Sequence, residues 1–195
     1  MESINLDLKK RYSFADYLTW LDDKRRELYN GFVQLMTPAP SIKHQSVSGQ
    51  IFGQFWLQLR KHSCKVYHAP FDVRFPSKQG EISDDKIFTV VQPDITVICD
   101  KSKLDGKGCI GAPDLIVEIL SLSTTKRDVE EKFKLYQDND VREYWIVHPN
   151  DETVTVFLLE NGKYQLQGIF AKGSIVKSAI SCGEITIDLE EVFEE

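Results

Sequence analysis

Apolar residues recur at helical spacing in three stretches of the chain and at strand spacing in most of the rest. The helical stretches are residues 13–23, 41–60 and 126–138. In the second stretch, Val47, Ile51, Phe55 and Leu59 stand four residues apart, which places them on one face of a helix. The pattern therefore predicts three helices, of which the second is the longest.

Serine and glycine residues add detail to these helices. Ser13 and Ser41 each stand directly before a helical pattern, where a serine side chain can accept a hydrogen bond from the first turn. Gly49 and Gly53 each weaken the second helix by up to about 1 kcal/mol relative to alanine. We therefore expect this helix to pack closely against another element at the two glycines.

Short runs of apolar or alternating residues, separated by turn signals, predict strands. They cover residues 66–68, 71–75, 94–99, 114–120, 141–147, 153–159, 163–170, 174–178 and 185–187, and the last four form a C-terminal β-meander. Asn30-Gly31 predicts an early hairpin, because both turn positions favour positive φ. Residues 100–112 are rich in lysine and glycine and indicate an exposed loop. Without repeats or linkers, residues 1–195 are expected to form a single α/β domain.

One charge interrupts the apolar run 115–120, and this residue, Glu118, is the strongest chemical signal in the chain. A carboxylate is seldom buried unless it is paired or bound to a metal. Strand alternation places Glu118 on the opposite face from Val117 and Ile119. Asp94 opens another strand directly after a proline. Two strands that each carry one carboxylate predict a divalent-metal site, with Asp94 and Glu118 as its ligands and the Ile119 carbonyl as a further candidate.

Composition and charge narrow the class of protein. Hydrophobic residues make up 42% and charged residues 28% of the chain, as in ordinary globular proteins. We expect a cytoplasmic protein, since no apolar run approaches the roughly 20 residues of a membrane span and no signal peptide is evident. The net charge of −6 argues against a broad nucleic-acid surface but is compatible with a local basic cleft. The four cysteines are scattered, which favours reduced thiols over a zinc site or disulfides; they are Cys64, Cys99, Cys109 and Cys182.

Hydrolysis of a phosphodiester also benefits from a cation that offsets the developing charge. A lysine two residues after Glu118 would lie on the same strand face, but this position is Leu120. Lys132 on the following helix is the best replacement, because it borders the apolar face of that helix and shares a stripe with Tyr136. Its alternative role is a solvated charge paired with Asp128.

Several motifs together resemble the Uma-two family of predicted endonucleases, within the PD-(D/E)XK nuclease superfamily. The motifs are RRELYNG around Glu27, His44-Gln45 after a proline-rich loop, HAPFDV at 68–73, QPDITVICD at 92–100, GAPDLIVEILSLST at 111–124, Asp128 with Lys132, and VREYWIV at 141–147. The resemblance covers most of the chain. Where the family commonly has acidic residues, this chain has Phe32 and His148, which concerns substrate contacts rather than the metal ligands.

The resemblance implies a restriction-endonuclease-like α/β core with a central mixed sheet flanked by helices. It also implies DNA cleavage that depends on Mg²⁺ or Mn²⁺, without an organic cofactor, at a site of Asp94, Glu118 and the displaced Lys132, with Glu27 nearby. A homodimer is a further implication drawn from the superfamily.

Three residues are candidates for contact with the substrate: His44, Gln45 and Tyr136. Each also has a structural alternative, since His44 stands in a first helical turn and Tyr136 is a core residue by its position. Two alternatives to a nuclease remain open. One is a catalytically silent nuclease-fold protein that binds nucleic acid or a protein partner. The other is an unrelated α/β protein in which Glu118 forms a buried ion pair.

Overall fold

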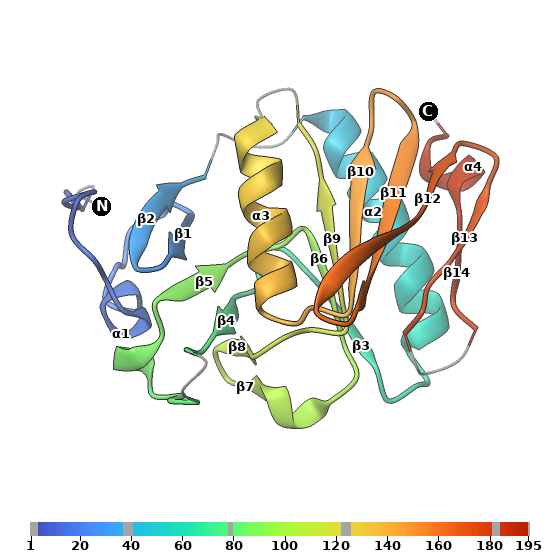
Figure 1. Cartoon of the computed structure of the whole chain (residues 1–195). Coiled ribbons are helices and arrows are strands. Elements are labelled where there is room, and N and C mark those ends of the chain that lie inside the picture. The colour runs from blue at the N-terminus through green and yellow to red at the C-terminus, as the bar shows by residue number, and fades with distance from the viewer. Residues whose placement is uncertain (1–3, 37–40, 78–79, 122–125, 181–183, 195) are drawn as a thin grey trace.

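A six-stranded mixed sheet runs through the middle of the protein (Figure 1). The computed structural model describes residues 4–36, 41–77, 80–121, 126–180 and 184–194, with the side chains of 126–128 left out. The sheet consists of β3 (Lys65–His68), β6 (Ile95–Ile98), β9 (Leu115–Ile119), β10 (Glu143–His148), β11 (Thr153–Glu160) and β12 (Lys163–Ala171), in the order β12-β11-β10-β9-β6-β3. The central mixed sheet implied by the sequence is confirmed.

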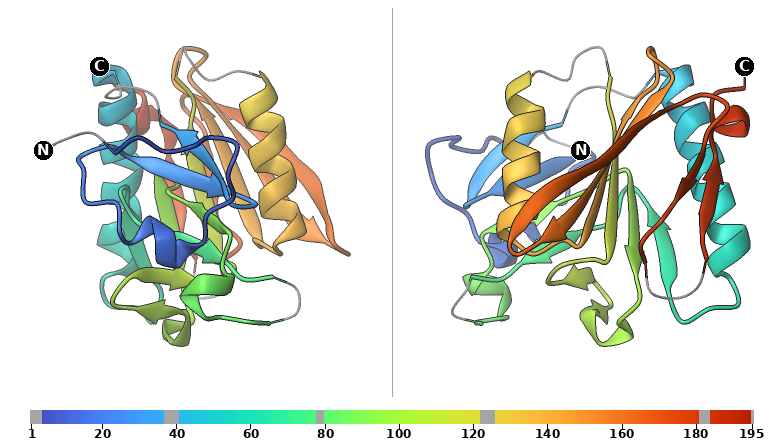
Figure 2. Two further views of the ribbon diagram at one scale, coloured as in Figure 1. Left: turned by 90° about the vertical axis from the view of Figure 1, so that its left-hand side faces the viewer. Right: turned by 45° about the vertical axis from the view of Figure 1, so that its right-hand side comes forward.

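Helices α2 (Ile42–Leu59) and α3 (Lys126–Asp138) cover opposite faces of this sheet, as Figure 2 shows from the side. Strands β9 and β10 are parallel, and their other neighbours are antiparallel. Parallel strands need a crossover connection, and α3 supplies it between β9 and β10. This crossover brings Lys132 to the face of β9 on which Glu118 lies.

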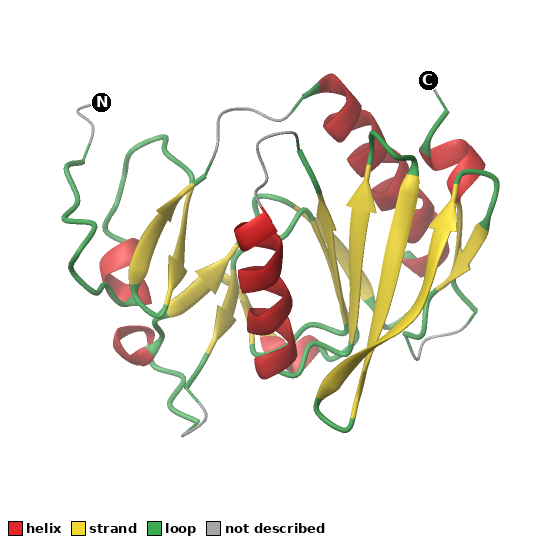
Figure 3. Ribbon diagram, turned by 45° about the horizontal axis from the view of Figure 1, so that its top comes forward, coloured by secondary structure: helices red, strands yellow, loops and turns green. Residues whose placement is uncertain are grey.

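A second six-stranded sheet lies beside the first one (Figure 3). It contains β1 (Arg26–Tyr29), β2 (Phe32–Leu35), β4 (Val73–Phe75), β5 (Thr89–Val91), β7 (Leu104–Asp105) and β8 (Gly108–Ile110), in the order β2-β1-β5-β4-β8-β7. The short helix α1 (Phe14–Tyr17) and the 3₁₀ turns η1 (Asp84–Lys86) and η2 (Lys101–Lys103) flank it. Strands β13 (Ile175–Lys177) and β14 (Thr186–Asp188) form a third, two-stranded sheet, followed by α4 (Leu189–Val192).

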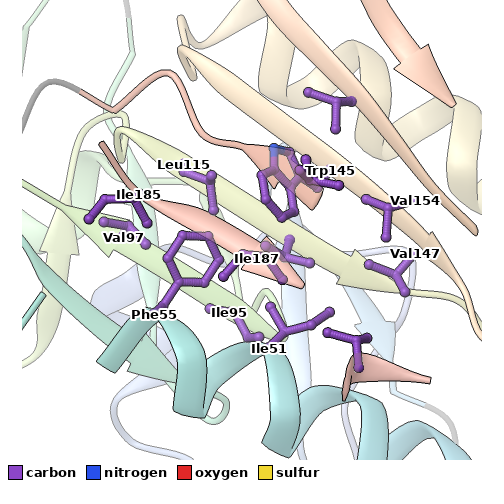
Figure 4. Close-up of a cluster of buried hydrophobic side chains, with 14 of the residues drawn as sticks. Ile51, Phe55, Ile95, Val97, Leu115, Trp145, Val147, Val154, Ile185 and Ile187 are labelled. Carbon is purple, nitrogen blue, oxygen red and sulfur yellow. The ribbon is translucent and has the colours of Figure 1, made fainter. Parts of the chain in front are cut away.

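Two hydrophobic cores lie on the two faces of the main sheet. The α2 side buries Phe55, Trp145 and Ile187, so it also holds the C-terminal strands in place (Figure 4). The α3 side buries Ile116, Tyr136 and Tyr144. Alternate residues of β9 enter different cores, because successive side chains of a strand point to opposite faces. The alternation predicted for this strand is confirmed.

Most local predictions are also confirmed. The hydroxyl groups of Ser13 and Ser41 accept hydrogen bonds at the starts of α1 and α2. Asn30 and Gly31 both have positive φ and join β1 to β2. The first helix is shorter than expected, since it ends at Tyr17 rather than near Asp23.

Some expectations about the fold are wrong. Gly49 and Gly53 do not mark close packing, because a Cβ atom at either position would meet nothing within 4 Å. Residues 100–112 are not merely a loop, since they contain η2 and the β7–β8 hairpin. Gly108 in this hairpin has a φ of +124°. A Cβ atom at this position would lie 2.2 Å from the Asp72 carbonyl oxygen, so only glycine allows the two backbone segments to approach this closely.

The C-terminal meander is also interrupted, because β11 and β12 extend the main sheet whereas β13 and β14 form their own.

The cysteines differ from expectation as well. Cys64 and Cys99 form a disulfide, whereas reduced thiols were predicted. The two residues flank β3 and β6, whose register pairs Lys65 with Ile98 and so brings the neighbouring cysteines opposite each other. Cys109 is a buried free thiol. Within the described ranges, no helix is long and apolar enough to cross a membrane.

Candidate active site

Asp94 is held at the start of β6 by contacts with two neighbouring segments. Its Oδ2 accepts a hydrogen bond from the N–H of Ile119 at 2.8 Å, and its backbone carbonyl accepts one from Ala69 at 3.0 Å. The side chain keeps 21% of its surface exposed. The bond to Ile119 fixes the Asp94 carboxylate beside the residue that follows Glu118.

Glu118 points from β9 toward α3 and is bound there by two side chains. Its Oε1 accepts hydrogen bonds from Lys132 Nζ at 2.8 Å and from the Tyr136 hydroxyl at 2.5 Å. Lys132 and Tyr136 stand one helical turn apart and therefore reach the same point on the sheet. The displaced lysine predicted from the sequence thus contacts the predicted carboxylate.

Glu27 reaches the same cluster from β1 of the second sheet. Its Oε1 lies 3.8 Å from Lys132 Nζ and accepts a hydrogen bond from the backbone N–H of Gln92 at 2.8 Å. The Tyr29 hydroxyl donates to the other carboxylate oxygen at 3.4 Å. The candidate site therefore lies where the two sheets meet, beside the middle of α3.

The cluster holds three carboxylates and one cation, Lys132, which contacts Glu118 and lies 3.8 Å from Glu27. Burial raises the pKa of Glu118 to about 7; Lys132 opposes this rise, and the charges of Asp94 and Glu27 add to it. Burial also tends to lower the pKa of Lys132, but Glu118 and Glu27 raise it well above the usual value. Lys132 is therefore protonated at neutral pH, and burial favours the protonated form of Glu118.

His44, in the first turn of α2, also approaches the Asp94 carboxylate. Its Nε2 is 3.4 Å from Asp94 Oδ2, and its Nδ1 is buried without a hydrogen-bond partner. Burial lowers the pKa of His44, but the hydrogen bond and charge of Asp94, a hydrogen bond to the Ile119 backbone and the charge of Glu118 raise it overall. The imidazole is directed at the carboxylate rather than at bulk solvent.

The oxygen donors of this cluster fit a divalent cation. Among the described residues, no group of three or more His, Cys, Asp or Glu side chains converges to hold a metal. Two carboxylates with one backbone carbonyl are nevertheless a suitable partial set for Mg²⁺, which commonly keeps several waters and takes further oxygens from a phosphate. Lys132 and Tyr136 both donate to Glu118 Oε1, so neither of these two hydrogen bonds occupies Oε2.

The other sequence candidates take different places. Tyr136 has no exposed surface and packs against Tyr144, so it presents no ring face on which a base could stack. Its contact with the site is through Glu118. Gln45 is exposed beside His44, and within the described part of the chain its side chain has no hydrogen bond to the carboxylates. The alternative partner of Lys132, Asp128, has a side chain outside the described residues.

Sequence reasoning did not find Gln92 and Tyr29, which both contact Glu27. Gln92 contacts Glu27 through its backbone N–H, and such a contact cannot be predicted from the type of side chain. The side chain of Gln92 donates to Asp72 at 2.9 Å and accepts from Arg25 at 3.0 Å, so it fixes the segment before Asp94. Its position directly before Pro93-Asp94 was the one available signal.

The fold is that of a putative nuclease of the DUF820 family from Anabaena variabilis, whose crystal structure superposes with a TM-score of 0.71. The match covers 93% of this chain and 97% of that one, at 17% sequence identity. Together with the mixed sheet and its flanking helices, this match places the chain in the class of restriction-endonuclease-like folds.

The chain belongs to the Uma2 family, described as "Putative restriction endonuclease", whose model matches residues 14–190. The resemblance noted in the sequence is thereby confirmed. A curated relative, "Uncharacterized protein slr1290" from Synechocystis, is 26% identical over 150 residues, which cover 75% of this chain and 74% of the relative. Family and fold support a nuclease at this coarse level.

Proposed function

We propose that this protein is a divalent-metal-dependent endonuclease that hydrolyses phosphodiester bonds in DNA. The observation that carries the proposal is the contact of Lys132, from α3, with Glu118, from β9. It supplies the cation that the strand itself lacks at Leu120. Asp94, tied to the next residue of β9, supplies the second carboxylate.

In this proposal, Asp94, Glu118 and the Ile119 carbonyl hold Mg²⁺ or Mn²⁺. The bound ion supplies Lewis-acid stabilisation of the phosphate and a water of lowered pKa. Lys132 offsets negative charge that develops on the phosphate, and it stays protonated because Glu118 and Glu27 raise its pKa. Tyr136 and Glu27 are positioning residues, since they act through Glu118 and Lys132. His44 and Gln45 remain candidates for substrate contact.

The test is cleavage of supercoiled and linear DNA by the purified protein with Mg²⁺ or Mn²⁺. Lys132→Met should lower the rate by about 100-fold or more, because several kcal/mol of charge stabilisation is lost. Lys163→Met is the matched control, since Lys163 is exposed on β12, away from the site. A metal-dependent activity that survives Lys132→Met would contradict the assigned role.

Metal binding is tested separately from cleavage. Calorimetry with Mn²⁺ should show binding to the wild type and its loss in Asp94→Asn and Glu118→Gln. If the wild type binds neither Mn²⁺ nor Mg²⁺ with a DNA duplex present, the chain has the fold without the chemistry. The proposed homodimer is checked by light scattering, where the mass of one chain would refute it.

A further inference from the structure

A groove of about 720 Å³ lies beside the proposed active site and is not used by it. Its walls are α3, the β1–β2 hairpin, the end of β4 and the start of β5, which lie next to one another in Figure 1. A volume of this size is typical of sites that hold a small molecule or a part of a larger one.

The groove lies next to the carboxylate cluster, and Tyr29 stands between the two. Glu131, which lines it, is the neighbour of Lys132 in α3. Tyr29 forms part of its wall and donates its hydroxyl to Glu27, and Glu27 lies 3.8 Å from Lys132 Nζ. The short distance past Tyr29 makes the groove a candidate site for the nucleotides that flank a phosphate bound at the cluster.

The lining combines aromatic rings with cations. Phe32 keeps 40% of its surface exposed, although it is a large apolar side chain. The Arg11 guanidinium lies 4.7 Å from the centre of the Phe88 ring. Lys86 and Lys134 are exposed at opposite walls of the same groove. Rings that stack on bases and cations that neutralise phosphates are the two components of single-strand binding sites.

The shape and charges favour unpaired nucleotides over a duplex. A duplex hides the faces of its bases and shows only their edges, which a protruding helix or ribbon reads. Here the aromatic rings line a concave surface, so bases must enter it singly. Asp138, an exposed carboxylate on the α3 wall, disfavours a phosphate there and can accept a hydrogen bond from a base amino group. The net charge of −6 likewise argues against a broad duplex-binding face.

We propose that this groove binds one or two unpaired nucleotides next to the scissile phosphate. The substrate class is then nucleic acid with a single-stranded segment, such as a single strand or a flap, rather than an uninterrupted duplex. The inference rests on the proposed nuclease function for its meaning as a substrate site, but the binding it predicts can be measured alone.

The binding test uses fluorescence anisotropy of a labelled single-stranded 12-mer and of the blunt duplex of the same sequence, with the Glu118→Gln protein. The single strand should bind more tightly than the duplex. Adding Phe32→Ala should weaken single-strand binding about fivefold or more, since stacking contributes roughly 1–3 kcal/mol per base. Ile169→Ala is the control, because Ile169 is likewise an exposed apolar residue but lies on β12.

A double charge reversal, Lys86→Glu with Lys134→Glu, provides a second readout. The slope of log affinity against log salt should become shallower by about 1.4, which corresponds to two lost phosphate contacts on a single strand. Lys163→Glu should leave the slope unchanged. Equal binding of duplex and single strand, or full single-strand affinity in Phe32→Ala, would overturn the inference.

Cleavage separates this inference from the proposed function. If wild type and Phe32→Ala cleave uninterrupted duplex equally well, the nuclease stands and the groove assignment fails. If wild type cleaves no DNA but binds single strands through Phe32, the groove assignment stands and the nuclease fails. Cleavage of a flap or single strand that depends on both Phe32 and Lys132 supports both.

Discussion

Two buried carboxylates on neighbouring strands of the main sheet have contrasting surroundings. Glu118 on β9 faces α3, while Glu143 on β10 faces the α2 side with Trp145 and has no exposed surface. Glu143 accepts hydrogen bonds from Trp145 Nε1, the Ser178 hydroxyl and the Ala179 N–H, at 2.7, 2.8 and 2.9 Å. Its partners are neutral donors that use both oxygens.

Glu118 instead accepts hydrogen bonds from a lysine and a tyrosine through one oxygen, and the charges of two more carboxylates, Asp94 and Glu27, act on it. Burial raises the pKa of both glutamates, although hydrogen bonds from Ser178, Trp145 and Ala179 oppose the rise at Glu143. At Glu118 like charges add to it. A carboxylate whose oxygens accept hydrogen bonds from neutral donors has a structural role, because it holds two segments of the chain together. A carboxylate with other carboxylates close by is suited to bind a cation. Burial alone therefore does not identify a functional carboxylate.

The same substitution at both positions gives the sharpest test of this contrast. Glu118→Gln should reduce metal-dependent cleavage about 1000-fold, because about 4 kcal/mol of transition-state stabilisation depends on the bound metal. At pH 5, where Glu118 is protonated, its stability should change by no more than about 1 kcal/mol, since the amide oxygen can still accept from Lys132 and Tyr136. Cleavage assays and urea unfolding measure the two effects. Near-normal cleavage would show that Glu118 is structural.

Glu143→Gln should have the opposite effect, with lower stability and unchanged activity per folded molecule. The amide NH₂ would face a hydrogen-bond donor, and each buried group left unpaired costs about 1–3 kcal/mol. We expect a loss of about 3 kcal/mol in the free energy of unfolding, measured with urea. Because Ser178 and Ala179 join the C-terminal sheet to β10 through Glu143, protection from hydrogen exchange should fall first in β13 and β14. If Glu143→Gln lost cleavage but kept its stability, Glu143 would not be the structural carboxylate of the pair.

The pH dependence of stability separates the two glutamates further. A carboxyl group whose folded pKa lies above its unfolded value destabilises the fold as pH rises between the two values. For Glu118 the window runs from about pH 4.5 to about pH 7, and the difference in stability between wild type and Glu118→Gln should change by up to about 3 kcal/mol across it. Mg²⁺ should reduce this change, because the cation competes with the proton.

Unfolding curves of both proteins between pH 5 and pH 8, with and without Mg²⁺, measure this difference. Carboxyl groups remote from this cluster titrate alike in the two proteins, so the difference reports on the cluster around Glu118. Parallel profiles would mean that Glu118 does not titrate in this window. Glu143, whose pKa is also raised, should retain its pH dependence when Mg²⁺ is added.

Much of the fold could be predicted from local patterns, because its burial follows helix and strand periodicity. The bounds of α3 and the alternation along β9 are examples, and they also brought Lys132 and Glu118 to a common face. The β7–β8 hairpin could not be predicted in this way. Its glycine allows close backbone contact with Asp72, which depends on a neighbour 36 positions earlier in the chain.

The site shows the same limit. Asp94 and Glu118 carried a local signal, since each is a charge next to an apolar run. Glu27 came from the family resemblance, and its contact with Lys132 depends on how the two sheets meet. The pairing of Cys64 with Cys99 required the register of β3 and β6, which spacing along the chain does not contain.

The smallest effect concerns Tyr136, which links the α3 core to Glu118. Tyr136→Phe removes the hydroxyl that donates to Glu118 and keeps the ring that packs against Tyr144. Loss of this bond should destabilise the protein by about 1 kcal/mol. Because a hydrogen bond to a carboxylate favours its charged form, the pKa of Glu118 should rise further. The acid limb of the pH profile of the cleavage rate should then move to higher pH.

Tyr164→Phe is the control, since the Tyr164 hydroxyl donates to the Val141 carbonyl at 2.9 Å, away from the carboxylates. Equal losses of stability, with a shifted pH profile in Tyr136→Phe alone, would show that Tyr136 positions Glu118; an unshifted profile would assign it to the core alone.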